Sequence, residues 1–141
     1  MTDETTNVMI IIIQTEEETA GYLRKYIDKV NNKEAKETLK EFLSNKESHI
    51  KACLNIFEER EDEKTYEEDL ETETYFEADP SDPEFIKNFV MFLYEKEKNS
   101  VKQFEKLVPE TNDEQIRLKI RKFISDNNQN VKKLMRLRDE L

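Results

Sequence analysis

The stretch SNKESHIKAC, from Ser44 to Cys53, holds the only histidine and the only cysteine of the chain. Imidazole and thiolate are metal ligands, and both serve as bases or nucleophiles in catalysis. A lone cysteine allows no intrachain disulfide and no CxxC zinc site. Cys53, one turn beyond His49, is expected to be a small buried apolar residue, with a redox thiol as the alternative. Any chemistry at His49 therefore depends on the residues that the fold brings to it.

Four segments show the three- and four-residue spacing of apolar side chains that predicts amphipathic helices. They run from about 6 to 30, 33 to 60, 83 to 108 and 113 to 141. Each spans roughly 24 to 30 residues and would be roughly 36 to 45 Å long. The 141-residue chain has only one glycine and three prolines. Together these features predict an all-α four-helix bundle in a single domain, 1–141.

The connection between the second and third segments, about 61 to 82, is far longer than the other two. From Glu58 to Asp79, twelve acidic residues stand against Arg60 and Lys64. A link this long can cross the whole bundle, so the second and third helices are expected to be parallel. We expect a solvated acidic crossover, with a basic partner or weak cation binding as the alternatives. Its apolar residues are expected to pin it to the bundle: Tyr66, Leu70, Tyr75 and Phe76.

The two predicted hairpins match each other when the sequence is shifted by 81 residues. Glu16 then falls on Glu97, and the turn residue Asn31 falls on Asn112. Apolar positions stay in phase through both helices and the turn, as in Leu39 with Ile120, Phe42 with Phe123 and Ile50 with Val131. This match predicts two pseudo-repeated hairpins related by a pseudo-twofold axis.

The pattern resembles the ferritin-like superfamily, and within it the rubrerythrin-like branch. The resemblance implies one inward Glu on the first helix of each hairpin and Glu-x-x-His on the second, which together hold two irons. TEEETAGYL places Glu16, and EKEKNSVKQF places Glu97, at the two Glu positions. LKEFLSNKESHIKACL aligns His49 with the histidine of the first hairpin.

Three of the six implied ligand positions carry other residues. Lys46 stands three residues before His49, and IRKFISDNNQNVKKLM puts Asn127 and Asn130 at the Glu and His positions. An ammonium has no lone pair to donate and repels a metal ion, and amides are weak ligands. The resemblance therefore implies a degenerate di-iron site.

This set of residues leaves three interpretations open. In the first, no cofactor binds, and Lys46 with a protonated His49 balances the two glutamates. In the second, Glu16, His49 and Glu97 hold one Fe, Mn or Zn ion, which requires Lys46 to swing away or to lose its proton. In the third, two-iron chemistry is retained. We expect a non-catalytic binding or structural protein; the alternative is a metal-binding oxidoreductase or iron-handling protein with an altered site.

The formal net charge of -10 argues against a nucleic-acid binder, which needs a basic surface, and against binding to an anionic membrane. The apolar run from Val8 to Ile13 is far shorter than the roughly 20 residues needed to cross a bilayer. The acidic N-terminus MTDETT does not have the basic start of a secretory signal. A cytoplasmic location is therefore expected.

The starts of the first and third helices, VMIIII and FVMFLY, are apolar around nearly their whole circumference. Residues such as Ile10, Ile11, Met91 and Phe92 need a partner outside the bundle centre. The crossover is one candidate cover, and a second copy of the chain is the other. We expect a homodimer through these apolar starts, in keeping with the resemblance.

Overall fold

The computed structural model describes residues 1–60 and 76–141. Within these residues it contains four long helices, two short 3-10 turns and no strand, as the apolar spacing predicted. The helices are α1 (Asp3–Tyr26), α2 (Lys33–Glu59), α3 (Phe85–Leu107) and α4 (Glu114–Glu140). The 3-10 turns Ile27–Lys29 and Val108–Glu110 follow α1 and α3 directly.

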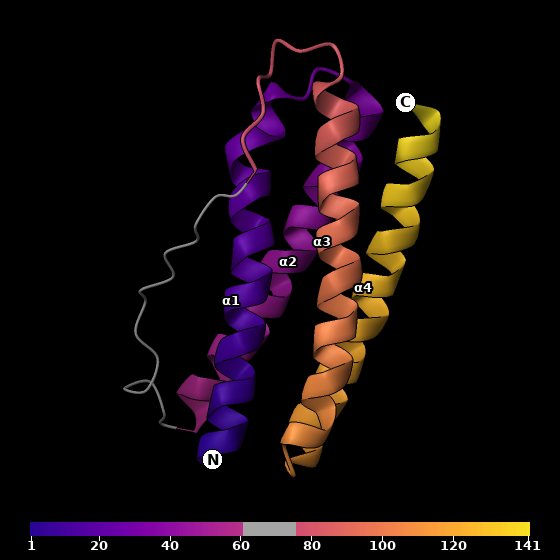
Figure 1. The fold of residues 1–141 in the computed structure, drawn as a ribbon. Helices are drawn as coiled ribbons and strands as arrows, with labels where there is room; N and C mark the ends of the chain where they lie inside the picture. Colours follow the sequence, from indigo (N-terminus) through magenta and orange to yellow (C-terminus); the bar gives the residue numbers. More distant parts are fainter. Residues whose placement is uncertain (61–75) are drawn as a thin grey trace.

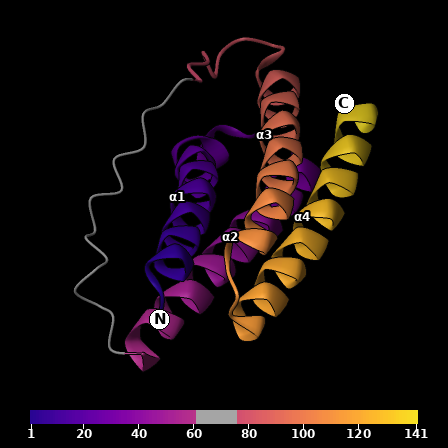
Figure 2. The same cartoon turned by 60° about the horizontal axis from the view of Figure 1, so that its bottom comes forward.

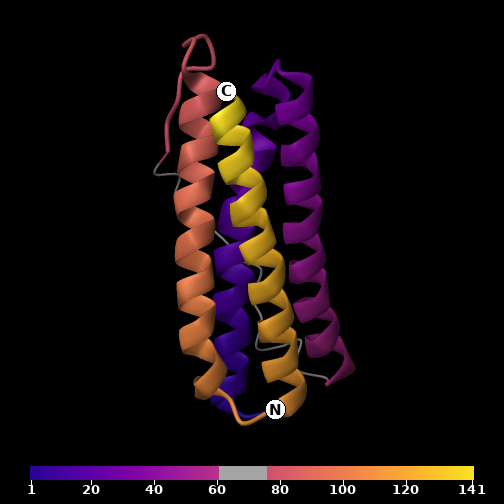
Figure 3. The same ribbon diagram turned by 90° about the vertical axis from the view of Figure 1, so that its right-hand side faces the viewer.

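The four helices form a bundle in which each has two neighbours. Helices α1 and α2 pack together as one hairpin, and α3 and α4 as the other (Figures 1 and 2). The hairpins meet along α1 with α3 and along α2 with α4, which lie beside each other in Figure 3. As predicted, α2 and α3 run in the same direction (Figure 1).

Short polar residues set where the helices begin. Thr2 caps α1 by accepting from Thr5 N at 3.2 Å, so this helix starts before the apolar run that predicted a start near residue 6. Asn32 caps α2 in the same way by accepting from Ala35 N. Helix α3 starts at Phe85, two residues after the predicted start, because Asp79 and Asp82 hold the preceding residues in turns.

The buried core consists of two apolar clusters with a polar layer between them. Leu23, Leu39 and Phe89 belong to the cluster near the start of α2. Ile13 and Phe104 belong to the cluster at the other end. On each of the four helices, buried polar side chains stand between the residues of one cluster and those of the other. The sequence therefore interrupts its apolar stripe at one level in all four helices.

The apolar starts of α1 and α3 are mostly covered. Ile10 and Ile11 are partly buried against the neighbouring core cluster. Phe92 stacks on Phe76 with ring centroids 4.4 Å apart, so the end of the crossover covers it. Met91 stays 41% exposed.

Phe76 thus pins the chain, as expected, and its carbonyl accepts a hydrogen bond from the Tyr26 hydroxyl at 3.3 Å. The other expected pins, Tyr66, Leu70 and Tyr75, lie outside the described residues, and so does most of the acidic crossover. A basic partner for that crossover stays a prediction. No helix in the described parts of the chain is long and apolar enough to cross a membrane.

Candidate functional site

The polar layer brings together all six positions that the sequence singled out. Helix α1 supplies one of them, α2 two, α3 one and α4 two, and all are buried: Glu16, Lys46, His49, Glu97, Asn127 and Asn130. Lys46, Glu16, Glu97 and Asn127 have no exposed surface at all. Each helix turns these residues inward because they continue the same face as the apolar core residues.

Lys46 lies at the centre of this layer. Its ammonium donates to Glu16 Oε2 at 2.7 Å, to Glu97 Oε1 at 2.7 Å and to Asn127 Oδ1 at 2.8 Å. Glu97 Oε2 is also only 2.6 Å from the same nitrogen. An ammonium has three N–H donors and no acceptor, so every donor of Lys46 has an oxygen to receive it. One side chain from α2 therefore joins α1, α3 and α4.

His49 lies between two carboxylates. Its Nδ1 is 2.6 Å from Glu16 Oε1, and its Nε2 is 2.8 Å from Asp126 Oδ2. Both ring nitrogens therefore lie at hydrogen-bonding distance from a carboxyl oxygen. The ring also packs on Phe123 with centroids 4.3 Å apart.

Asn130 of α4 links Glu97 to Asn45 of α2. Asn130 Nδ2 donates to Glu97 Oε2 at 2.9 Å and to Asn45 Oδ1 at 2.7 Å. Among the described residues, Thr19 Oγ1 is the one buried side-chain nitrogen or oxygen without a hydrogen-bond partner. The buried nitrogens and oxygens of the six singled-out residues are therefore all hydrogen-bonded, which is the condition under which buried charges are tolerated.

The two central glutamates have opposite pKa shifts. Burial acts to raise the pKa of Glu16, but the charges of Lys46 and His49 and their hydrogen bonds bring it below its ordinary value. Burial, reinforced by the Glu16 carboxylate, raises the pKa of Glu97 to about 7, although Lys46 and Asn130 act against it. Glu16 is thus held firmly as the anion, while Glu97 is the carboxyl that takes up a proton first.

Ion pairs link the charged groups of the layer. Lys46 contacts both Glu16 and Glu97, and His49 contacts Glu16. Asp126, at the solvent side of His49, is paired in turn with Lys122 at 3.0 Å. Partial burial acts to raise the pKa of Asp126, but hydrogen bonds from His49 and Lys122 lower it.

These residues do not fit a di-iron centre. In the described parts of the chain, no group of three or more His, Cys, Asp or Glu side chains is arranged to hold a metal ion. The Lys46 ammonium lies within 2.7 Å of both glutamates and so takes the place between them where a cation would bind. A zinc ion would need oxygen atoms at about 2.0–2.2 Å and no competing cation. His49 has no free nitrogen to offer because both nitrogens are engaged with carboxylates.

Cys53 lies one turn beyond His49 in the buried core. Burial and the Glu16 charge raise the pKa of its thiol to about 12. A thiol is a nucleophile or metal ligand only as the thiolate, so Cys53 acts here as an apolar packing residue.

Two residues of the layer were not expected from the sequence, Asn45 and Asp126. Each lies one position before an inward residue, at the edge of the helix face, so apolar spacing does not select it. The signal that was available is the shift of 81 residues, which places Asn45 on Asp126 just as it places Lys46 on Asn127. Both reach the layer from the seam between α2 and α4.

The fold and the site define an all-α four-helix bundle with a buried polar layer of hydrogen-bonded charged and amide side chains at mid-height. Comparisons of the chain with known protein families, with curated proteins and with solved structures found no match. Its function is therefore inferred from its own residues.

Proposed function

We propose that this chain is a rubrerythrin-like, ferritin-like bundle that has lost its two-iron site and acts as a non-catalytic binding or structural protein. The observation that carries the proposal is the position of the Lys46 ammonium, bonded to Glu16 and Glu97 at 2.7 Å. It supplies the positive charge that the inward carboxylates of such a bundle would otherwise receive from metal. The pseudo-repeat and the parallel course of α2 and α3 support the family assignment.

Among the described residues, the buried polar groups are engaged with one another and not free for catalysis. Both nitrogens of His49 contact carboxyl groups, burial raises the pKa of the Cys53 thiol to about 12, and Lys46 has three oxygen acceptors. A general base or nucleophile needs a free lone pair within reach of a substrate. The alternative, an oxidoreductase or iron-handling protein using one metal at Glu16, His49 and Glu97, requires Lys46 to leave both glutamates.

Metal analysis tests the proposal. The chain is purified without chelator, and its iron, manganese and zinc contents are measured before and after incubation with each ion. We expect no stoichiometric metal in the wild type. Lys46→Glu, which replaces the ammonium with a carboxylate, is expected to gain affinity for a divalent ion, whereas Lys40→Glu on the exposed side of the same helix is not. Near-stoichiometric metal in the wild type that His49→Ala abolishes would refute the proposal.

A further inference from the structure

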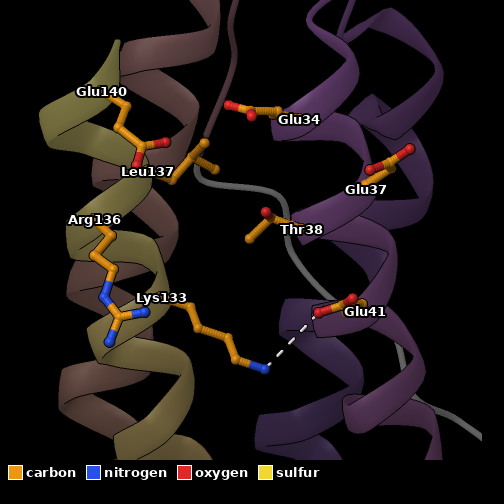
Figure 4. A pocket seen from close by; sticks show the side chains of 8 residues that line it. All are labelled: Glu34, Glu37, Thr38, Glu41, Lys133, Arg136, Leu137 and Glu140. Atoms are coloured by element: carbon orange, nitrogen blue, oxygen red, sulfur yellow. Dashed lines mark ion pairs between the residues drawn. The ribbon is translucent and has the colours of Figure 1, made fainter.

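The face formed by α2 and α4 is hollowed at both ends. Near the start of α2, a cleft of about 300 Å³ lies between Glu34, Glu37 and Glu41 on one wall and Lys133 and Arg136 on the other (Figure 4). Near the end of α2, a second hollow of about 480 Å³ lies between the same two helices. The bundle therefore has a groove along the seam that the polar layer bridges in the middle.

Charge is sorted between the two walls of this groove. Four glutamates from α2 line the hollows: Glu34, Glu37, Glu41 and Glu59. Four cations from α4 line them on the opposite side: Lys119, Lys122, Lys133 and Arg136. Helix α4 as a whole carries eight basic and four acidic residues, in a chain whose net charge is -10. Glu140 of α4 and Arg60, at the end of α2, also line the hollows. The α2 wall thus carries four acids and one base, and the α4 wall four bases and one acid.

Most of these charged side chains form no close ion pair among the residues that the structure describes. Across the groove, Glu41 and Lys133 approach only to 3.8 Å, and both side chains are more than half exposed. Glu34, Glu37 and Arg136 form no ion pair with any other described residue, although they line the same cleft (Figure 4). Both walls therefore present charge to whatever lies over the groove.

The hollow near the end of α2 also has an exposed apolar side chain in its lining. Leu118 of α4 is 62% exposed, the largest exposed fraction of any large hydrophobic residue described. It lines the hollow together with Ile56 of α2. An apolar side chain this exposed, set between opposite charges, is a typical element of a protein interface.

We propose that this groove is the contact face of a symmetric dimer, and that its occupant is a second copy of the chain. A twofold axis along the groove, parallel to the helices, places α2 of one copy over α4 of the other at the same height. The glutamates near residues 34 to 41 then face the partner's basic residues near 133 to 136. At the other end, Ile56 of each copy faces the partner's Leu118, and Glu59 faces the partner's Lys119.

The sorting of charge selects this axis over the other twofold arrangement. An axis across the helices would place α2 on α2 and α4 on α4, so that mainly acidic side chains would face acidic ones and mainly basic side chains would face basic ones. The parallel axis makes the same face complementary to itself, as a closed dimer requires.

This surface differs from the one expected from the sequence. Of Ile10, Ile11, Met91 and Phe92, only Met91 is exposed. The apolar starts of α1 and α3 are therefore mostly covered within the chain itself. This inference goes beyond the proposed function and does not depend on whether the polar layer binds metal. The metal assay tests the polar layer and the following experiment tests the α2–α4 face, so either can fail without the other.

Paired charge reversals test the interface. One variant carries Lys133→Glu and Arg136→Glu, and the other carries Glu37→Lys and Glu41→Lys. The mass of each full-length variant is measured over a range of concentrations by sedimentation equilibrium, with circular dichroism to verify folding. Lys102→Glu with Lys106→Glu, at exposed positions of α3, is the control for altered net charge.

We expect a wild-type dimer whose dissociation constant rises by roughly tenfold or more in either reversal variant and changes little in the control. An equimolar mixture of the two reversal variants should regain the dimer. In the mixed dimer the new glutamates of one variant face the new lysines of the other, and the two unchanged walls face each other. A wild-type chain that is monomeric at every concentration would overturn the proposal. A dimer that both variants retain, or a mixture that fails to recover, would overturn this interface.

Discussion

A lysine ammonium in a protein interior requires oxygen acceptors in three directions, and the bundle provides them from three different helices. These hydrogen bonds offset the free energy of removing the ammonium from water, which is high unless every donor is paired. A buried ion pair gives little net stability compared with an apolar core, but removal of one partner leaves the other charge buried and unpaired. Loss of Lys46 would therefore destabilise the fold mainly because Glu16 and Glu97 would stay buried without their cation.

Lys46→Met keeps a side chain of similar length and removes the charge. Glu16 and Glu97 would then share the layer without the cation that both contact. We expect the free energy of unfolding at pH 7 to fall by about 3–5 kcal/mol. Urea denaturation measures this change, and Lys40→Met at an exposed position of α2 serves as the control. A loss no larger than that of the control would show that the ammonium is not needed.

At the scale of elements, Asp113 links the end of one helix to the start of another. Its carboxylate caps α4 by accepting from Gln115 N and Ile116 N, and it also accepts from Arg60 at the end of α2. The hydrogen bond from Arg60 lowers the pKa of Asp113. One partly buried side chain thus caps the first turn of α4 and ties the two hairpins together at this end of the bundle.

Substitution of Asp113 separates the two roles. Asp113→Ala removes both the cap and the ion pair, and we expect a loss of about 1–2 kcal/mol in the free energy of unfolding. Asp113→Asn keeps a capping oxygen and loses only the charge of a partly exposed pair, so the expected loss is below about 1 kcal/mol. Thermal unfolding followed by circular dichroism compares the two. Equal destabilisation by both variants would contradict the capping role.

At the scale of the whole molecule, the polar layer couples folding to pH. The pKa of Glu97 is raised to about 7 from an ordinary value of 4.5. Between these values the folded chain keeps a proton that the unfolded chain has lost. The stability from this group is therefore fully present below about pH 4.5 and is lost as the pH rises toward 7. Glu16 has a lowered pKa, so its contribution is present above pH 4.5 and is lost as the pH falls through its folded pKa.

We therefore expect Glu97→Gln to change how stability depends on pH. The amide resembles the protonated acid, so the variant should lack the decline that Glu97 causes between about pH 4.5 and 7. That decline amounts to at most about 1.4 kcal/mol per pH unit for one proton. Urea denaturation at pH 5, 6 and 7 measures it. Identical pH profiles for the variant and the wild type would contradict the raised pKa.

Glu16→Gln provides the contrast. This carboxylate accepts from Lys46 and His49, and its charged form is favoured, so the loss of stability at pH 7 should exceed that of Glu97→Gln. The reverse order would mean that the two glutamates have exchanged roles.

The sequence by itself determined the helices and the inward positions. Apolar residues at three- and four-residue spacing fix which face of each helix is buried, and this spacing is a local property of the chain. The ferritin-like resemblance, read in this phase, singled out six inward positions, and all six are buried: Glu16, Lys46, His49, Glu97, Asn127 and Asn130. The long crossover, a matter of chain length, was enough to predict that α2 and α3 are parallel.

Only the tertiary structure decided how these residues pair. Lys46 contacts residues of three other helices that are 30, 51 and 81 positions away in the chain. No local pattern specifies such contacts. The partnership of His49 with Asp126 and the opposite shifts of Glu16 and Glu97 likewise depend on burial and on distances across the bundle. The acidic and basic walls of the α2–α4 groove exist only because the fold brings two distant helices side by side. Helix phase is encoded within a few turns of chain, whereas charge neutralisation depends on neighbours that only folding supplies.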